Sequence, residues 1–173
     1  SRLHQLHTLD ATWNDLSTLA DNACGMDGLK VLNLSHNHLL FLPDCFGYKS
    51  LEFLDLSYNS IAKLPAGISN MQNLKEINLT GNKIIAVPES IGRISSLKFI
   101  SFTNNELTAV PESIGKLKNL EMLLLSNNQL TSLPKSIRKL KNLRTLMLVN
   151  NRLTPKEQQK IKKWLPHTEI VSN

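Results

Sequence analysis

The sequence repeats one pattern at an almost constant interval of 23 residues. Each copy of the pattern ends on an asparagine, and successive asparagines are 23, 22, 23, 23, 23 and 23 residues apart: Asn14, Asn37, Asn59, Asn82, Asn105, Asn128 and Asn151. Before each asparagine, apolar residues alternate with variable ones, as in Leu51-Glu-Phe-Leu54-Asp-Leu56-Ser-Tyr-Asn59. A period of roughly 20 to 50 residues predicts a solenoid in which each unit packs against its neighbours.

The second half of most units has its own pattern. A proline follows the asparagine, and Ile or Phe comes three residues later: Pro43 with Phe46, Pro65 with Ile68, Pro88 with Ile91, Pro111 with Ile114, and Pro134 with Ile137. The alternating leucines predict short strands with one buried face. Parallel neighbouring strands need a crossover on the far side, where the apolar spacing of three predicts a short helix or 3-10 turn.

The composition follows from the repeat. The chain has 32 leucines and 18 asparagines, but only 5% of its residues are aromatic. Leucines fill the strand positions, so the core is expected to be a stack of thin aliphatic layers. An asparagine amide both donates and accepts hydrogen bonds, so it can satisfy backbone groups of its own turn and of the adjacent unit.

These motifs resemble the leucine-rich repeat family in its form LxxLxLxxNxLxxLPxxIxxLxx, over essentially the whole chain from Leu3 to Asn173. The LP-x-x-I spacing is similar to the Ras-suppressor/Shoc2-like class and to many bacterial relatives. The resemblance implies an α/β fold, a right-handed horseshoe-shaped solenoid. Its parallel β-sheet would form the concave face, and short helical or 3-10 crossovers would form the convex face. We expect a single domain, residues 1–173, of about seven repeats.

The two ends of the chain differ. Thr154-Pro155-Lys-Glu157 predicts a helix start, with a capping box and proline at the first helical position. Residues 152–173 are expected to form a C-terminal cap and a partial eighth repeat that cover the open edge of the core. At the other end Leu3 begins in the middle of a unit, so we expect a chain cut from a longer one or lacking its true start.

The sequence contains no catalytic or metal-binding motif that we recognise. It has no G-x-S-x-G, no H-E-x-x-H and no glycine-rich phosphate loop, and its histidines lack partners at metal-ligand spacing. We therefore expect no enzyme activity, no cofactor and no metal. The sequence contains no run of about 18 apolar residues, so it predicts no transmembrane segment. Cys24 and Cys45 are expected to be buried free thiols, with a disulfide as the alternative.

Charge is unevenly distributed around a formal net charge of +6. Residues 1–86 carry 6 Lys/Arg against 8 Asp/Glu, whereas residues 87–173 carry 14 against 6. Arg93, Lys116 and Lys139 share one crossover position, which favours a solvated convex face. Binding to an anionic polymer or a membrane is the lesser alternative. Nucleic-acid binding is disfavoured because aromatic residues are not interleaved with these cations.

The best candidate site lies on the strand face opposite the core. Exposed apolar patches commonly mark partner surfaces, and Trp, Tyr and Met are enriched at interfaces. The candidate partner-binding residues form an N-terminal group of Trp13, His36, Phe53, Asp55 and Tyr58, and a C-terminal group of Phe99, Met122, Leu124, Met147 and Val149. The competing interpretation of the C-terminal group is that the terminal segment folds over it, or that crystal or homo-oligomer contacts hide it.

The sequence therefore predicts a non-enzymatic module that binds a protein partner on its concave face. The alternative is a regulatory or targeting domain of a larger signalling enzyme or of a bacterial effector. The resemblance implies a small GTPase or another signalling protein as partner. It favours a cytoplasmic location, with a secreted bacterial protein as the second choice. Partner identity and oligomeric state do not follow from the sequence.

Overall fold

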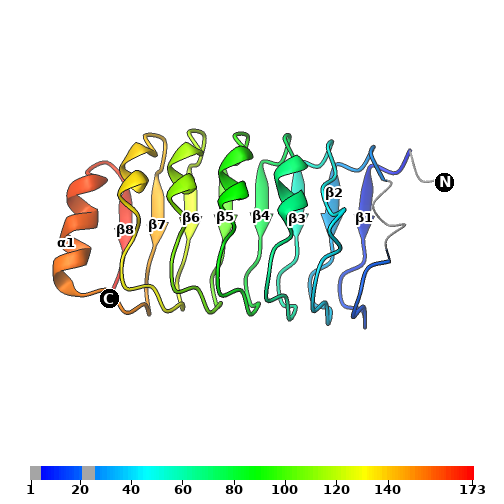
Figure 1. Ribbon diagram of the computed structural model, residues 1–173, viewed down its shortest axis with the longest axis horizontal. Coiled ribbons are helices and arrows are strands. Elements are labelled where there is room, and N and C mark those ends of the chain that lie inside the picture. Colours follow the sequence, from blue (N-terminus) through cyan, green and yellow to red (C-terminus); the bar gives the residue numbers. More distant parts are fainter. Residues whose placement is uncertain (1–4, 21–25) are drawn as a thin grey trace.

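A computed structural model describes residues 5–20 and 26–173; Leu3 and Cys24 lie outside these ranges. Its eight strands form one sheet in chain order, and each strand is parallel to the next. The strands are β1 (Thr8–Asp10), β2 (Val31–Asn33), β3 (Phe53–Asp55), β4 (Glu76–Asn78), β5 (Phe99–Ser101), β6 (Met122–Leu124), β7 (Thr145–Met147) and β8 (Glu169–Val171). Figure 1 shows them side by side, with β1 and β8 at opposite ends of the row. The predicted solenoid with a parallel sheet is confirmed.

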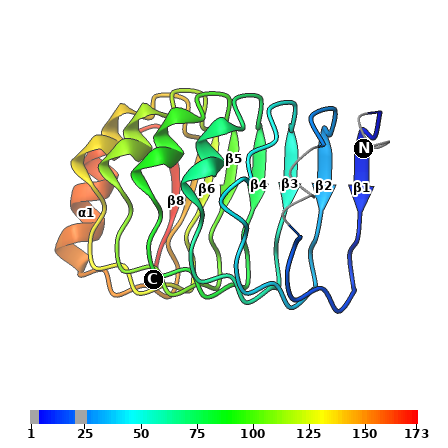
Figure 2. The ribbon, with the colours of Figure 1, turned by 45° about the vertical axis from the view of Figure 1, so that its right-hand side comes forward.

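The crossovers contain short helices where the prolines predict them. Within the described residues, four 3-10 helices occur: η2 (Ala66–Asn70), η3 (Glu89–Arg93), η4 (Glu112–Lys116) and η5 (Lys135–Lys139). Each follows a proline with extended backbone, as at Pro88 (φ −69°, ψ 148°), and each buries an isoleucine. In Figure 2 these helices stack along one side of the molecule, and the strands line the other side. The predicted 3-10 crossovers are confirmed.

The core consists mainly of the predicted aliphatic layers. The central residue of each strand from β2 to β7 points inward and is buried, as are the leucines and isoleucines of the crossovers. Three aromatic side chains also fit inside, namely Phe46, Tyr48 and Phe102. The rings of Phe46 and Tyr48 meet edge to face with centroids 5.1 Å apart. Burial raises the pKa of the Tyr48 hydroxyl to about 12.

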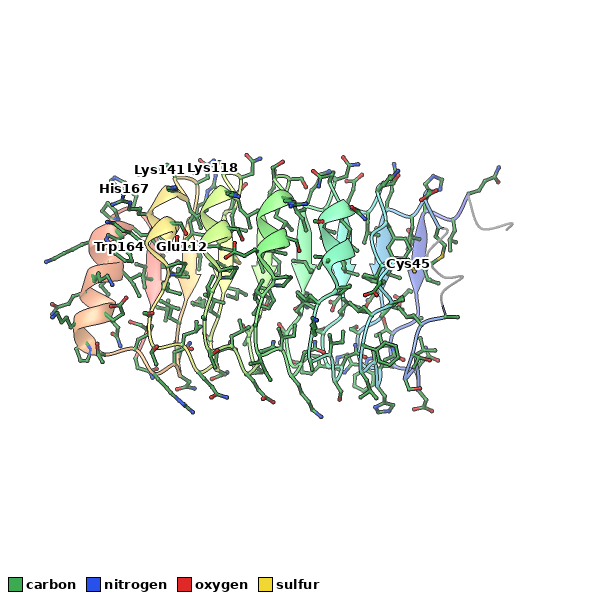
Figure 3. The ribbon with its side chains drawn as sticks, in the orientation of Figure 1. Cys45, Glu112, Lys118, Lys141, Trp164 and His167 are labelled. Atoms are coloured by element: carbon green, nitrogen blue, oxygen red, sulfur yellow. The ribbon has the colours of Figure 1, made fainter. Side chains whose placement is uncertain are left out.

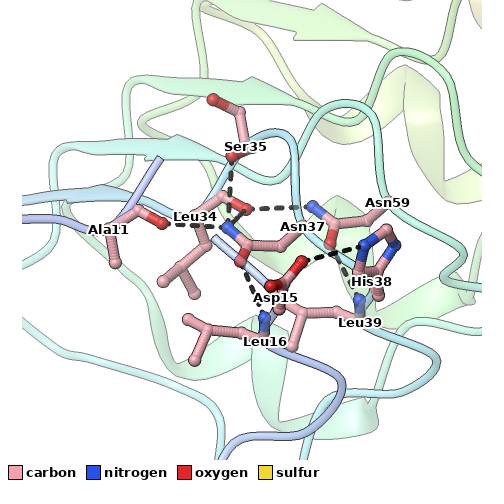
Figure 4. A network of polar contacts seen from close by, with 9 residues as sticks. All are labelled: Ala11, Asp15, Leu16, Leu34, Ser35, Asn37, His38, Leu39 and Asn59. Carbon is pink, nitrogen blue, oxygen red and sulfur yellow. Dashed lines mark hydrogen bonds and ion pairs between the residues drawn. The ribbon is translucent and has the colours of Figure 1, made fainter. Parts of the chain in front are cut away.

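The repeated asparagines link neighbouring units through their side chains, as Figure 4 shows for Asn37. Asn37 Nδ2 donates to the carbonyls of Ala11 (2.9 Å) and Leu34 (3.0 Å), and its Oδ1 accepts from the amide of Leu16 (3.0 Å). The same arrangement recurs at Asn59, Asn82, Asn105 and Asn128. Each amide thus bonds to its own turn and to the preceding unit, as predicted.

The C-terminal cap begins where the capping motif places it. Helix α1 (Pro155–Trp164) has Pro155 in its first turn, and Thr154 Oγ1 accepts a hydrogen bond from the amide of Glu157 (3.2 Å). Ile161 is fully buried against the last repeat. After the helix, β8 pairs with β7 and continues the sheet. The open edge of the core is therefore covered by a helix and a final strand.

The expectation of a buried free thiol is wrong for Cys45. This residue is exposed and disulfide-bonded. The physical reason is its place in the turn after Pro43: the inward position of that crossover belongs to Phe46, so Cys45 faces outward. The sequence has only one other cysteine, Cys24, which lies outside the described residues.

Candidate functional site

The C-terminal group of predicted site residues forms one surface on the exposed face of the sheet. The strand register places Phe99 beside Met122, and Leu124 beside Met147. All five predicted side chains keep solvent exposure, and Met122 is 36% exposed. We call this surface the apolar patch; it comprises Phe99, Met122, Leu124, Met147 and Val149. The strand register thus places four members of the C-terminal group in adjacent pairs, and Val149 follows two residues after Met147, beyond the end of β7.

The terminal segment extends this surface instead of covering it. Because β8 pairs alongside β7, Val171 lies next to Met147 and adds a further half-buried apolar side chain to the apolar patch. The interpretation in which the last residues fold over the patch is therefore wrong. Sequence reasoning missed Val171, although the repeat frame of the partial eighth unit places it in the same column as Met147.

At the N-terminal end, three predicted residues form a stack of rings. The ring centroids of Trp13 and His36 are 3.8 Å apart, and those of His36 and Tyr58 are 4.4 Å apart, with interplanar angles of 10° and 18°. Trp13 is 75% exposed and Tyr58 is 50% exposed. We call these three side chains the aromatic edge. The structure confirms their adjacency and shows a contact geometry that the sequence could not supply.

The backbone of the aromatic edge is left-handed. The φ angles of Trp13, His36 and Tyr58 are 55°, 55° and 53°. The same position in the next four units also has positive φ and is occupied by Gly81, Asn104, Asn127 and Asn150. Gly and Asn tolerate this conformation, whereas other residues held there cost roughly 1–3 kcal/mol each. The solenoid imposes the turn, and aromatic side chains occupy it at three units despite the backbone strain.

Phe53 and Asp55 lie apart from the two clusters. Phe53 is half-buried on β3, and Glu76 on β4 separates it from Phe99 of the apolar patch. Asp55 accepts hydrogen bonds from the amide of Ser57 (2.8 Å) and from Asn78 Nδ2 (3.0 Å), so its carboxylate helps to order the sheet surface.

Asp10 is the equivalent of Asp55 in the first unit, and its carboxylate accepts hydrogen bonds from the neighbouring Thr12. Side-chain and backbone hydrogen bonds from Thr12 lower the pKa of the exposed Asp10 carboxyl, which is therefore ionised at neutral pH.

Basic side chains line two adjoining cavities at the C-terminal end, of about 530 and 350 Å³, and the larger one is also lined by the carboxylate of Glu121, which pairs with Arg144. Arg138, Lys141 and Trp164 line both cavities. Lys139 and Lys163 line the smaller cavity, and Arg144 and His167 line the larger one. Figure 3 shows Lys141 and His167 at this end of the molecule, with Trp164 on the cap helix. Trp164 directly follows Lys163 in the chain, and in the fold it lines both cavities together with Arg138 and Lys141. The Nζ atom of Lys160 lies 4.6 Å from the centroid of the Trp164 ring.

The described ranges, 5–20 and 26–173, hold neither a membrane-spanning helix nor a metal-binding cluster. No helix there is both long and apolar enough to cross a membrane. No group of three or more His, Cys, Asp or Glu side chains in this part of the chain is arranged to hold a metal ion.

The chain matches three leucine-rich repeat models. They are a leucine-rich repeat region at residues 89–164, a model of two leucine-rich repeat copies at 49–92, and a leucine-rich repeat model at 4–61. A solved leucine-rich repeat protein from Leptospira interrogans is 39% identical with a TM-score of 0.83, over 98% of this chain and 50% of that chain. This chain belongs to the leucine-rich repeat proteins, as the repeat pattern predicted.

More distant solved structures share the fold. One is the ectodomain of a plant membrane receptor kinase from Arabidopsis thaliana, in complex with Casparian strip integrity factor 2 (23% identity, TM-score 0.80, 96% of this chain, 21% of that chain). Another is an internalin from Listeria monocytogenes (20% identity, TM-score 0.71, 97% of this chain, 55% of that chain).

One curated protein, an adenylate cyclase of Schizosaccharomyces pombe, is 36% identical over 77 residues, which span 42% of this chain and 5% of the cyclase.

Proposed function

We propose that this chain is a non-enzymatic module that binds a protein partner through the apolar patch. The observation that carries the proposal is a contiguous apolar surface on a sheet whose neighbouring strands hold its side chains in fixed register. Such a surface is ordered before binding, so association loses little conformational freedom. Met122 at 36% exposure is well placed to insert into a partner, and Phe99 and Leu124 supply flanking contacts.

A double substitution tests this proposal. The double variant Met122→Glu/Met147→Glu is expected to bind a partner captured by the wild-type chain with about 100-fold lower affinity. The reason is that two carboxylates would have to be desolvated at the contact. The matched control is Leu40→Glu with Ile85→Glu, which adds the same charge at exposed apolar positions outside the patch. The partner is captured with the wild-type chain, and titration calorimetry then measures its affinity for each double variant. A partner that binds both double variants equally well would overturn the proposal.

The second candidate is binding of an anionic polymer or membrane surface at the basic cavities. It is supported by Arg138, Lys139, Lys141 and Lys163 around Trp164; among the described residues, no carboxylate lies within ion-pair distance of these four cations. We expect any such binding to weaken steeply with salt, because phosphate or sulfate contacts release counterions.

The salt dependence can be measured with heparin as the probe. Retention of the whole chain on heparin is expected to fall as salt rises from about 50 to 200 mM and to fall further in the variant Arg138→Gln/Lys141→Gln. The control Lys63→Gln/Lys83→Gln removes two charges from other units, at residues that line neither cavity. This candidate would be excluded if retention did not change with salt concentration. It would also be excluded if the control variant lowered retention as much as Arg138→Gln/Lys141→Gln does.

The third candidate is a regulatory or targeting region of a larger protein. Its support is the similarity to a short stretch of an adenylate cyclase and to half of the Leptospira protein.

For location, the disulfide at Cys45 supports an oxidising compartment, and hence a secreted protein over a cytoplasmic one, because reducing compartments keep thiols free.

A further inference from the structure

The exposed face of the sheet carries acidic side chains but no basic ones. The eight strands contain four acidic residues and no Lys or Arg, although the whole chain has 20 Lys/Arg against 14 Asp/Glu. The four are Asp10 on β1, Asp55 on β3, Glu76 on β4 and Glu169 on β8. The positive charge of the chain therefore lies outside the face that holds the apolar patch.

Two of these carboxylates stand at the ends of a row that crosses the apolar patch. The strand register gives one residue from each of β4 to β8, in the order Glu76, Phe99, Met122, Thr145 and Glu169. Neighbouring parallel strands lie about 4.8 Å apart, so the backbones at Glu76 and Glu169 are roughly 19 Å apart. Both residues are exposed. The apolar patch thus has one exposed carboxylate on each side.

The fold does not use the charges of Glu76 and Glu169. Within residues 5–20 and 26–173, neither carboxylate lies within ion-pair distance of a cation. The cations at this edge of the sheet pair with other carboxylates: Lys75 with Glu52, and Arg144 with Glu121. Both charges at the ends of the row are therefore available to a ligand.

The geometry assigns a charge pattern to the partner. We propose that the apolar patch binds a partner segment whose apolar side chains lie between two Lys or Arg side chains, which pair with Glu76 and Glu169. The inference rests on the proposed function of the apolar patch and adds the chemistry of its partner. In an extended segment, every second side chain points to the same side and each residue rises about 3.3 Å. Two cations six residues apart therefore span roughly 20 Å, which matches the separation of the two carboxylates.

These charges select the partner more than they tighten its binding. Exposed ion pairs contribute little free energy, whereas the carboxylates repel acidic segments that would otherwise suit an apolar surface. The net charge of +6 on the whole chain also disfavours cationic segments elsewhere on the molecule. The acidic ends of the row thus direct a cationic segment to the apolar patch.

Selection from a peptide library tests the charge pattern. Random peptides displayed on phage are selected on the wild-type chain at low salt. Those that also bind Met122→Gln/Met147→Gln are then removed, because this variant loses apolar side chains of the patch without gaining charge. The peptides that remain depend on the apolar patch. They are expected to be enriched in Lys and Arg on both sides of an apolar stretch, relative to the unselected library.

Titration of one selected peptide then tests the two carboxylates. Glu76→Gln/Glu169→Gln is expected to lower its affinity by about 2- to 5-fold for each carboxylate removed, the range for exposed ion pairs. The matched control Asp44→Asn/Glu106→Gln removes two exposed carboxylates outside the sheet face and should bind as wild type does. The charge reversal Glu76→Lys/Glu169→Lys should prefer the same peptide with Glu in place of its two cations.

The outcomes separate this inference from the proposed function. Patch-dependent peptides without enrichment in Lys or Arg, or equal losses in the glutamate variant and its control, would overturn the inference and leave the proposed function standing. A selection that yields no patch-dependent peptide would overturn both. A wild-type dimer in sedimentation that Met122→Gln/Met147→Gln dissociates would assign the apolar patch to a second copy of the chain, and would also overturn the inference.

Discussion

Asn105→Ala is expected to lower the free energy of unfolding by about 1–3 kcal/mol, because it leaves the buried amide of Ile84 unsatisfied and removes one of the two amide donors at the carbonyls of Leu79 and Phe102. Asn105 Nδ2 donates to the carbonyls of Leu79 (2.9 Å) and Phe102 (3.1 Å), and its Oδ1 accepts from the amide of Ile84 (3.0 Å). Two of these partners belong to the preceding unit. Alanine would therefore weaken both a turn and the contact between two repeats, as urea-induced unfolding followed by circular dichroism would show.

Asn14→Ala provides the matched control at the same frame position. The Asn14 amide is exposed, and among the described residues it donates only to carbonyls of its own unit, at Ala11 and Thr12. Water can replace these bonds, so we expect a loss below about 1 kcal/mol. Equal losses at Asn14 and Asn105 would show that the asparagines do not stabilise the stack through the preceding unit.

Ile161→Ala is expected to cost about 2–5 kcal/mol, the range for truncating a buried isoleucine to alanine. Ile161 has no exposed surface, and it is the one fully buried side chain of helix α1. Since each unit of a solenoid contacts only its neighbours, the damage should be concentrated at the cap. Hydrogen exchange should therefore show loss of protection in α1 and β8 before β2 to β5.

Lys162→Ala is the control, because Lys162 follows Ile161 on the same helix and is exposed. We expect it to change stability by less than about 0.5 kcal/mol. Unchanged protection of α1 and β8 in Ile161→Ala would mean that the helix does not depend on this side chain for its attachment to the last repeat.

The apolar patch could be predicted residue by residue, and the stack at Trp13 only in part. Phe99 and Met122 are neighbours because parallel strands in register place equal frame positions side by side. The frame also places Trp13, His36 and Tyr58 in one column. The parallel stacking of their rings depends on the left-handed φ at each residue and on the space above Gly81, neither of which is a property of spacing.

The repeat pattern was enough to predict the solenoid, the strand order and the buried asparagine ladder. Each unit packs only against its neighbours in the chain, so a pattern along the chain is also a pattern of contacts between units. Features that depend on how separate surfaces meet became visible only in the folded chain. The fold placed Trp164 at the same two cavities as Arg138 and Lys141, added Val171 to the apolar patch and turned Cys45 outward into a disulfide. These outcomes depend on the docking of the cap and the direction of single side chains, which the repeat leaves open.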